Sequence, residues 1–398
     1  MNKRHLIIKK IGPLDNVDIL LSRINLIIGP QSAGKSCILK IASFCAWLEK
    51  SIEESLNKDI YLSRQIVDEH LIAFYNLEGY VSEDSYFAYK TDTMKFSFSF
   101  KDNSSTFEWG KGRWYYKQSK IAYIVAERNI LSVVPNWFEM NFPNNSIRNF
   151  LTEWQNARNY AKGKPALPIL NMGVGYRYDN ESGADKILLE NGSELKLNNV
   201  SSGLQSLVPL FILADYMAHG IYSSNMRSVK DQEAALSLYK KLEKEFPESH
   251  SSESVKETLQ KIMTAFTTYD HSDIYLEEPE ENLFPETQID LVNWLAEILN
   301  EERKHSLFIA THSPYIMSAF NNLIQAGNVI AESPAKLEKV NNIIGEKHSV
   351  KYDDVAAFAI GNGTVHNIMD DDFCLISAEA LDGVSEDIAR NFDYLLNV

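Results

Sequence analysis

Near its start the chain reads Gly29-Pro30-Gln31-Ser32-Ala33-Gly34-Lys35-Ser36. The two glycines and the Lys-Ser pair have the spacing of a phosphate-binding loop. An apolar run over residues 24–28 precedes the loop, and apolar residues recur at three- and four-residue intervals after Ser36. The loop is therefore expected to join a buried strand to a helix, a context in which backbone N–H groups and a helix N-terminus hold phosphate oxygens.

The loop predicts a site for a triphosphate and a metal ion. Lys35 is expected to place its positive charge at the β- and γ-phosphates, and the Ser36 hydroxyl is expected to ligate Mg²⁺. The residues expected to contact the nucleotide are Gly29, Pro30, Gln31, Ser32, Ala33, Gly34, Lys35, Ser36 and Cys37. The alternative is a chance match in a glycine-containing turn, which the flanking strand and helix patterns disfavour.

A second motif, Ile274-Tyr275-Leu276-Glu277-Glu278, is an apolar strand that ends in two carboxylates. A buried acid at this place needs a cation, and Mg²⁺ supplies one. We assign Glu277 to the magnesium shell and Glu278 to the role of general base that polarises the attacking water. Glu280 and Glu281, which follow, are interpreted as a solvated surface cluster.

The rest of the chain predicts an α/β fold with a mixed sheet. Continuous apolar runs at 24–28, 121–125, 273–277 and 307–311, with helical patterns between them, favour a covered and mostly parallel sheet. An earlier stretch differs, because Phe96, Phe98 and Phe100 alternate with polar residues as in antiparallel strands. A hairpin is expected around the turn Gly361-Asn362-Gly363, since Asn-Gly readily adopts positive φ.

Composition excludes several classes of protein. The chain has 398 residues, 44% hydrophobic and 23% charged, which is typical of a globular protein with more than one structural unit. The longest apolar stretch, 204–214, is shorter than the roughly 20 residues that cross a bilayer, and no signal peptide is recognised, so we expect a cytoplasmic protein without a membrane partner. Three cysteines indicate neither a disulfide scaffold nor a zinc site.

The net charge limits the possible partners. Fifty-four acidic residues against 39 basic ones give a net charge of -15, which opposes indiscriminate nucleic-acid binding but allows a local basic groove. A segment that interleaves cations with aromatic rings could form such a groove, or could be an ordinary hairpin: Lys111, Arg113, Trp114, Tyr115, Tyr116, Lys117 and Lys120. The run 370–372 of three aspartates is not taken as a nuclease centre, because no companion motif accompanies it.

A third motif reads Val200-Ser201-Ser202-Gly203-Leu204-Gln205. Taken alone, it is a helix N-cap, since a serine before an apolar helical run satisfies free backbone donors. Its position between the phosphate-binding loop and Glu277 matches the signature loop of ABC-type ATPases. Two further motifs are Leu276-Glu277-Glu278-Pro279-Glu280-Glu281-Asn282-Leu283-Phe284-Pro285 and Ala310-Thr311-His312-Ser313-Pro314.

With these motifs the chain resembles the RecF/SMC/OLD branch of ABC-type ATPases. A wider resemblance, which includes Lys10-Ile11-Gly12-Pro13 and Ala126-Glu127-Arg128-Asn129, is to the ATPase subunits of Septu-type and retron-associated anti-phage defence systems. The resemblance implies a P-loop NTPase fold with an ABC-type ATPase head over 1–225 and 271–330. The residue pattern itself predicts two charged amphipathic helices over 226–270, interpreted as an insertion, and a C-terminal β-hairpin with an acidic helical tail over 331–398.

The resemblance also implies roles for particular residues. Ser201, Ser202, Gly203 and Gln205 would contact nucleotide, with Ser202 reaching the γ-phosphate bound to another subunit. His312 would be the switch histidine that senses the γ-phosphate, and Asn282 would lie in the loop that couples two sites. The chain departs from the pattern at Leu204, which replaces a glycine, and at Glu277, which replaces the commoner aspartate. It also has no glutamine in 124–129, where the roles of Glu127 and Arg128 stay open.

The function implied is ATP hydrolysis with ATP and Mg²⁺ as ligands, by a homodimer or a higher even-numbered homo-oligomer. Because no second catalytic constellation is visible in the sequence, the switch would act on a separately encoded effector, a nuclease or another toxic enzyme. The alternative is a RecF/SMC-like ATPase that binds DNA in repair or chromosome maintenance. A transporter subunit is disfavoured by the long interval between the signature loop and Glu277.

Overall fold

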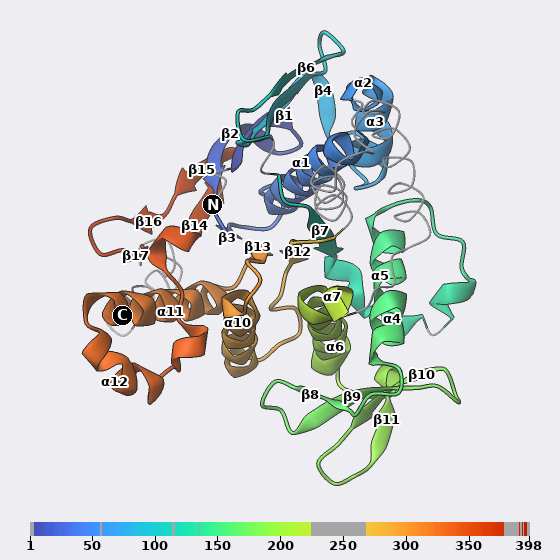
Figure 1. The fold of residues 1–398 in the computed structure, drawn as a ribbon, viewed down its shortest axis with the longest axis vertical. Coiled ribbons are helices and arrows are strands. Elements are labelled where there is room, and N and C mark those ends of the chain that lie inside the picture. The colour runs from blue at the N-terminus through green and yellow to red at the C-terminus, as the bar shows by residue number, and fades with distance from the viewer. Residues whose placement is uncertain are drawn as a thin grey trace, which may run out of the picture.

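The computed structural model describes residues 4–55, 58–113, 116–134, 136–223 and 268–377, together with 390, 392, 394 and 395. Most of the predicted insertion at 226–270 and of the predicted tail helix therefore lies outside the described residues. One sheet of eleven strands dominates the rest, in the order β6-β5-β4-β1-β2-β15-β14-β3-β13-β12-β7 (Figure 1).

The four predicted apolar strands lie side by side at one end of this sheet. They are β3 (Ile24–Ile28), β13 (Ser306–Thr311), β12 (His271–Glu277) and β7 (Ser119–Ile124), and neighbouring members pair in parallel. Every residue of β13 is buried, as is every residue of β12 after the first. Burial on both faces explains why these strands have no polar alternation, and the predicted parallel, covered sheet is confirmed.

Strand register brings the functional motifs to one edge of the sheet. Ile28 lies opposite Thr311, and Ala310 lies opposite Glu277. The carboxyl ends of β3, β13, β12 and β7 therefore meet at the same edge, which is where ligands bind in parallel α/β sheets.

The predicted antiparallel region forms the other end of the sheet. It contains β1 (Arg4–Ile11), β2 (Leu14–Leu21), β4 (Val81–Lys90), β5 (Met94–Ser99) and β6 (Ser104–Trp109). In β5, Met94, Phe96 and Phe98 are buried, and Lys95, between the first two, is exposed. Buried and more exposed residues therefore alternate along the strand as the sequence predicts. Its neighbours β4 and β6 pair with it in antiparallel fashion.

The predicted C-terminal hairpin is present and is built into the main sheet. Strands β14 (Val355–Gly361) and β15 (Thr364–Asn367) are antiparallel, and φ values of 50° at Asn362 and 75° at Gly363 make the turn between them. Strand β14 also pairs in parallel with β3. The hairpin thus lies beside the phosphate-binding loop, although the sequence assigns it to a separate C-terminal segment.

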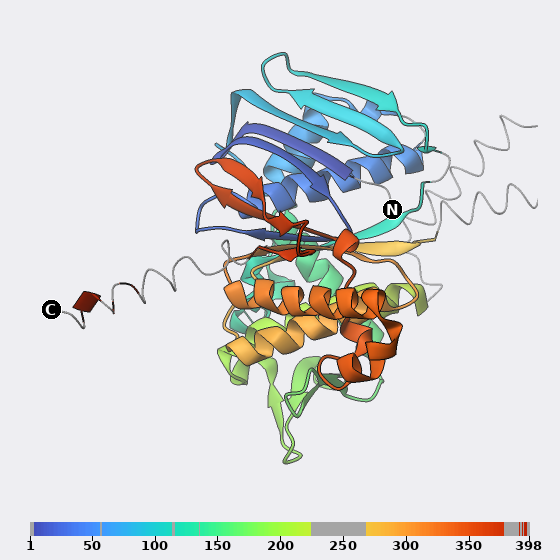
Figure 2. The ribbon, with the colours of Figure 1, turned by 90° about the vertical axis from the view of Figure 1, so that its left-hand side faces the viewer.

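Helices cover both faces of the central strands. The helix predicted after Ser36 is α1 (Lys35–Ser55), and its predicted face is buried at Ile38, Ile41, Ala42, Cys45 and Leu48. Four other helices cover the opposite face, as two perpendicular views show (Figures 1 and 2). They are α5 (Ser146–Ala161), α6 (Ser202–Asp215), α10 (Pro285–Asn300) and α11 (Pro314–Glu332).

A second sheet, which the sequence did not indicate, packs beyond these helices, at the far end of the molecule from β5 and β6 (Figure 2). Its strands are β8 (Leu167–Ile169), β9 (Val174–Asp179), β10 (Ala184–Leu188) and β11 (Glu194–Lys196). The remaining elements are short: α2 (Lys58–Tyr61), α3 (Arg64–Val67), η1 (Asp68–Ala73), η3 (Ala126–Asn129), α4 (Ile130–Val133), η4 (Trp137–Glu139), η5 (Leu197–Asn199), η6 (Tyr216–Gly220), α7 (Ile221–Ser223), η8 (Pro334–Lys336), α12 (Leu337–Asn341), η9 (Glu346–His348), η10 (Tyr352–Asp354), β16 (Met369–Asp370) and β17 (Leu375–Ile376).

One helical stretch, Ser202–Ser223, has the length and apolar composition of a membrane span. The protein buries 72% of its most apolar window, and a core helix passes the same test. Its apolar character is therefore explained by packing within the fold.

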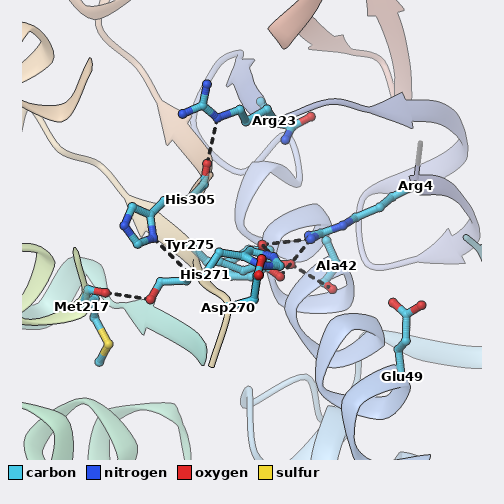
Figure 3. Close-up of polar contacts among 12 residues, drawn as sticks. Arg4, Arg23, Ala42, Glu49, Met217, Asp270, His271, Tyr275 and His305 are labelled. Atoms are coloured by element: carbon cyan, nitrogen blue, oxygen red, sulfur yellow. Dashed lines mark hydrogen bonds and ion pairs between the residues drawn. The ribbon is translucent and has the colours of Figure 1, made fainter. Parts of the chain in front are cut away.

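A polar cluster lies at the amino ends of the central strands (Figure 3), whereas the phosphate-binding loop follows the carboxyl end of β3. The Arg4 guanidinium binds both carboxylate oxygens of Asp273, at 2.9 and 3.0 Å, and this pairing holds the pKa of the buried carboxyl below its usual range. Nearby, Nδ1 of His305 accepts a hydrogen bond from the backbone N–H of Ser272 at 3.0 Å. A cavity of about 1330 Å³ adjoins the Arg4–Asp273 pair.

His305 is expected to make the protein less stable in mild acid. The side chain is 1% exposed, and burial together with neighbouring positive charges lowers its pKa to about 4. Between the unfolded pKa of about 6.5 and this value, the unfolded chain takes up a proton that the folded chain does not, so stability falls as pH falls. Urea unfolding measures the free energy of unfolding at pH 7.5 and at pH 5. Between these two pH values it should fall by about 2 kcal/mol more in wild type than in His305→Gln, whose side chain at this position does not titrate. Equal losses in the two proteins would contradict this.

Candidate functional site

The phosphate-binding loop, residues 29–34, connects β3 to α1 as predicted. Ser32 and Gly34 adopt positive φ, 60° and 105°. A Cβ at Gly34 would lie 2.5 Å from Cδ2 of Leu14, so both the backbone conformation and the packing require glycine there. The first turn of α1 carries no acidic residue. The helix therefore places no acid of its own against an anion bound at its N-terminus.

Lys35 lies at the centre of the predicted site and is 5% exposed. Its Nζ donates to the carbonyl oxygens of Gly29 at 2.8 Å and Pro30 at 2.9 Å. Burial lowers the pKa of Lys35, and the charges of Glu278 and Glu280 oppose that shift. The loop that is predicted to bind phosphate therefore also fixes the position of the Lys35 ammonium group.

His312 joins Lys35 to Glu278. Nζ of Lys35 lies 3.2 Å from Nδ1 of His312, and Nε2 of His312 lies 3.3 Å from Oε1 of Glu278. With a protonated lysine, these partners assign the tautomer in which Nδ1 accepts and Nε2–H donates to the carboxylate. Three residues predicted from three separate motifs therefore form one continuous contact series.

Glu278 has an unusual backbone conformation. Its φ is 44°, in the left-handed region that residues with a Cβ rarely adopt. Its N–H donates to the carbonyl of Ala310 at 2.8 Å, and its own carbonyl accepts from Nη2 of Arg128 at 2.6 Å. The side chain is 41% exposed, so the carboxylate borders on solvent at the edge of the sheet.

Glu277 is buried at 6% exposure and accepts hydrogen bonds from the Tyr123 hydroxyl at 2.7 Å and the Ala126 N–H at 3.3 Å. Within the part of the chain that the structure describes, it forms no ion pair with a lysine or arginine. Burial of the Cys37 thiol, together with the charge of Glu277, raises the pKa of that thiol to about 11, which places Glu277 near the start of α1.

The Ser36 hydroxyl and the Glu277 carboxylate are suitable ligands for a Mg²⁺ ion that is also coordinated by phosphate oxygens. The described residues contain no group of three His, Cys, Asp or Glu side chains that could hold a metal by themselves. Magnesium beside phosphates usually takes only one or two carboxylates and completes its shell with phosphate oxygens and water. Ser36 and Glu277 would supply the protein's share of such a shell.

The signature motif forms the N-terminus of α6, where Ser201 is the N-cap and accepts from the Leu204 N–H at 3.5 Å. Ser201 and Ser202 are exposed, and among the described residues no hydrogen bond joins them to the phosphate-binding loop. Helices α6 and α1 lie on opposite sides of the central strands (Figure 1). The amide of Gln205 donates to the carbonyls of Val200 and Asn198 and so holds the turn before the helix, while its contact with nucleotide stays a prediction.

The loop after β12 contacts α6, the helix that begins at Ser202, within the same chain. The side-chain amide of Asn282 donates to the Ser206 hydroxyl at 2.9 Å. A Cβ at Gly203 would lie 3.0 Å from the Asn282 carbonyl oxygen, so the two backbones approach closely. The loop that carries Glu278 and the helix that carries Ser202 are therefore packed against each other.

The interpretation of Glu280 and Glu281 as a solvated surface cluster is wrong. Oε1 of Glu280 accepts the N–H of His312 at 2.5 Å, and Oε2 of Glu281 lies 3.5 Å from Nη2 of Arg128. Both acids are half-buried because the loop turns back toward the sheet edge instead of running out into solvent. Glu280 thereby helps to fix the backbone of His312.

Sequence reasoning also missed Tyr123, which binds Glu277. The available signal was its place in β7, since the parallel pairing of two apolar strands sets Tyr123 beside Tyr275, two residues before Glu277. In the basic and aromatic segment 111–120, three of the cations form ion pairs with acids of the same chain. Lys117 pairs with Asp270, Lys120 with Glu153, and Arg113 with Glu53.

No protein-family model matches the chain, and no curated protein matches it. Among solved structures it is similar to an SMC head domain from Thermotoga maritima, with 12% identity, a TM-score of 0.41, and coverage of 92% of this chain and 98% of that one. It is also similar to the recombination mediator RecF, with 8% identity, a TM-score of 0.35, and coverage of 92% of this chain and 98% of that one. A bacterial ABC transporter cassette, described as dimeric, matches with 13% identity, a TM-score of 0.30, and coverage of 92% and 97%.

The fold class rests on the chain's own architecture. A phosphate-binding loop lies between a central parallel strand and a helix, and the mixed sheet carries the Glu277–Glu278 strand two places away. The chain is thus a mixed α/β protein of the P-loop NTPase class, as predicted from its sequence.

Proposed function

We propose that the protein is a nucleotide-gated switch that binds ATP between two copies of the chain, hydrolyses it, and controls a separate effector. The observation that carries this proposal is the contact series from Lys35 through His312 to Glu278, at 3.2 and 3.3 Å. It brings a cation for phosphate oxygens and a carboxylate for water to the same edge of the sheet as the phosphate-binding loop.

The residues of the site divide the chemistry among themselves. The backbone of 29–36 and Nζ of Lys35 bind phosphate oxygens, and Glu278 accepts the proton of the attacking water. His312 Nε2–H faces the Glu278 carboxylate and orients it, while Glu280 fixes the histidine backbone. Mg²⁺, held by Ser36 and Glu277, would neutralise charge that develops on the phosphate oxygens.

A second copy of the chain would complete each site. Ser202 lies exposed at the N-terminus of α6, on the other face of the central strands from α1. This position supports contact with a nucleotide on a partner subunit, because a helix N-terminus with a serine N-cap favours an anion. The proposal therefore includes a homodimer or a higher even-numbered assembly, with the cytoplasmic location expected from the sequence.

The effector and the role in anti-phage defence rest on the sequence resemblance. A DNA-binding ATPase of the RecF/SMC kind is the alternative, and the engagement of Lys117, Lys120 and Arg113 with acids disfavours it. DNA affinity at 50 and 200 mM salt separates the two. Binding that is tight, falls steeply with salt and weakens in Lys111→Glu would favour the alternative.

Phosphate release by the purified full chain, measured with ATP and Mg²⁺, tests the proposal. Lys35→Ala should weaken ATP binding at least about tenfold, or about 1.4 kcal/mol, and abolish hydrolysis, because the buried cation of the loop is lost. Lys40→Ala, farther along the same helix, is the matched control and should behave as wild type. The proposal fails if Lys35→Ala hydrolyses ATP as wild type does, or if wild type hydrolyses neither ATP nor GTP with DNA and its effector present.

A further inference from the structure

Arg128 is a buried cation at the edge of the sheet that carries the site. It lies in η3, directly after β7, and its side chain is 0% exposed. Burial lowers its pKa, and the charges of Glu281, Glu280, Glu278 and Glu277 oppose that shift. A buried guanidinium is strongly unfavourable unless its donors are all engaged.

The surroundings of Arg128 engage all three of its side-chain nitrogens. Nε donates to the Ser206 carbonyl at 3.0 Å, and Nη1 donates to the carbonyls of Val125 at 3.4 Å and Glu277 at 2.9 Å. Nη2 donates to the Glu278 carbonyl at 2.6 Å and lies 3.5 Å from the Glu281 carboxylate. A planar guanidinium has five N–H donors in a fixed geometry, so one side chain binds three segments of backbone at once.

One of those segments is the strained backbone of Glu278. A left-handed conformation at a residue with a Cβ costs about 1–3 kcal/mol and persists only where its surroundings hold it. Here the Ala310 carbonyl holds the N–H of Glu278, and Arg128 holds its carbonyl. The direction of the Glu278 side chain therefore depends on the Arg128 contact.

Another segment is the helix that begins at Ser202. Ser206 lies one turn into α6, so its carbonyl moves with the helix N-terminus. Asn282 makes a second link from the same helix to the loop after β12. A displacement of the first turns of α6 would therefore act through the Arg128 guanidinium on the peptide group of Glu278.

We propose that Arg128 is a positioning residue that couples the Ser202 end of α6 to Glu278. Contact of Ser202 with a nucleotide on the partner subunit would set α6, and Arg128 would then set the Glu278 carboxylate for hydrolysis in its own subunit. This inference rests on the proposed function, because it assigns a link between the two sites of that ATPase. It gives Arg128, whose role the sequence leaves open, a function other than ligation of the metal.

Steady-state kinetics of Arg128→Lys tests the inference. Lysine keeps the charge but loses the fork, so kcat should fall about 10- to 100-fold through misplacement of Glu278, while KM and ATP-dependent association change less than about threefold. Arg23→Lys is the matched control, because Arg23 also donates to a backbone carbonyl and a carboxylate, those of His305 and Asp354, but at the other edge of the sheet. It should lower thermal stability without lowering kcat. Arg128→Lys with wild-type kcat would overturn the inference.

A double variant separates positioning from general damage to the fold. In single-turnover assays on a Glu278→Gln background, Arg128→Lys should change the residual rate less than about twofold, because its effect passes through the missing carboxylate. A further drop equal to that in wild type would overturn the inference. If Arg128→Lys does not fold, Glu281→Gln weakens the same guanidinium, and an unchanged kcat there also overturns it. Absence of phosphate release by wild type would instead refute the proposed function.

Discussion

Replacing Glu278 with Gln is expected to lower the rate of ATP hydrolysis by about a thousandfold and to leave ATP binding intact. Glutamine keeps the size of the side chain but cannot accept the proton of the attacking water, and removal of a general base typically costs about 10²–10⁴ in rate. The contacts with nucleotide are assigned to the phosphate-binding loop and not to the Glu278 side chain. ATP should therefore remain bound, and closed dimers should accumulate.

Phosphate release and size-exclusion chromatography with ATP measure the two effects. Glu338→Gln is the control for the chemical change, since Glu338 is an exposed acid in α12, outside the motifs of the site. It should change the rate less than about twofold, as an exposed side chain does when it makes no contact with the reacting groups. Hydrolysis by Glu278→Gln at the wild-type rate would mean that another residue is the base.

Ser202→Arg is expected to abolish ATP-dependent association while nucleotide binding by the monomer changes less than about threefold. An arginine at the N-terminus of α6 adds bulk and positive charge at the positive end of the helix, where the γ-phosphate of the partner's nucleotide is expected. Analytical ultracentrifugation with and without ATP measures the loss. Ser104→Arg, on the exposed edge strand β6, controls for the added charge and should associate normally.

Mixing two inactive variants gives a sharper result. A dimer of one Ser202→Arg chain and one Lys35→Ala chain has one site with both residues intact and one site with both altered. The mixture should therefore recover hydrolysis that neither variant shows alone. Failure of Ser202→Arg to change ATP-dependent association, together with no recovery on mixing, would show that each site is complete within a single chain.

The sequence predicts the parallel centre of the sheet well because burial on both faces leaves a direct mark on composition. Runs such as 24–28 and 307–311 contain no charged residue, and both are central strands. The edge at which they end follows from parallel pairing alone, so the motifs are sufficient to bring Lys35, Glu278 and His312 to one place. The distances between these side chains and the order of their contacts depend on the folded loops.

Other features depend on tertiary contacts that leave no local pattern. Strands of the second sheet are short and only partly buried, and every residue of β11 is exposed, so neither periodicity nor apolar content marks them. The sequence places Arg128 as a charged residue in a polar turn, but its side chain is fully buried because the backbone carbonyls of Val125, Ser206, Glu277 and Glu278 converge on it. Glu280 likewise owes its position to a turn of the loop back toward His312.

The place of β14 beside β3 has a consequence for how the protein is made. Ile24, near the start of the chain, pairs with Val355, near its end, and a Cβ at Gly29 would lie 2.8 Å from the Ile360 carbonyl. During translation, β3 therefore has both its neighbouring strands available only after β14, about 330 residues later in the chain, has left the ribosome. Chains that end before β14 lack the strand against which the loop at Gly29 packs, so we expect them not to bind nucleotide.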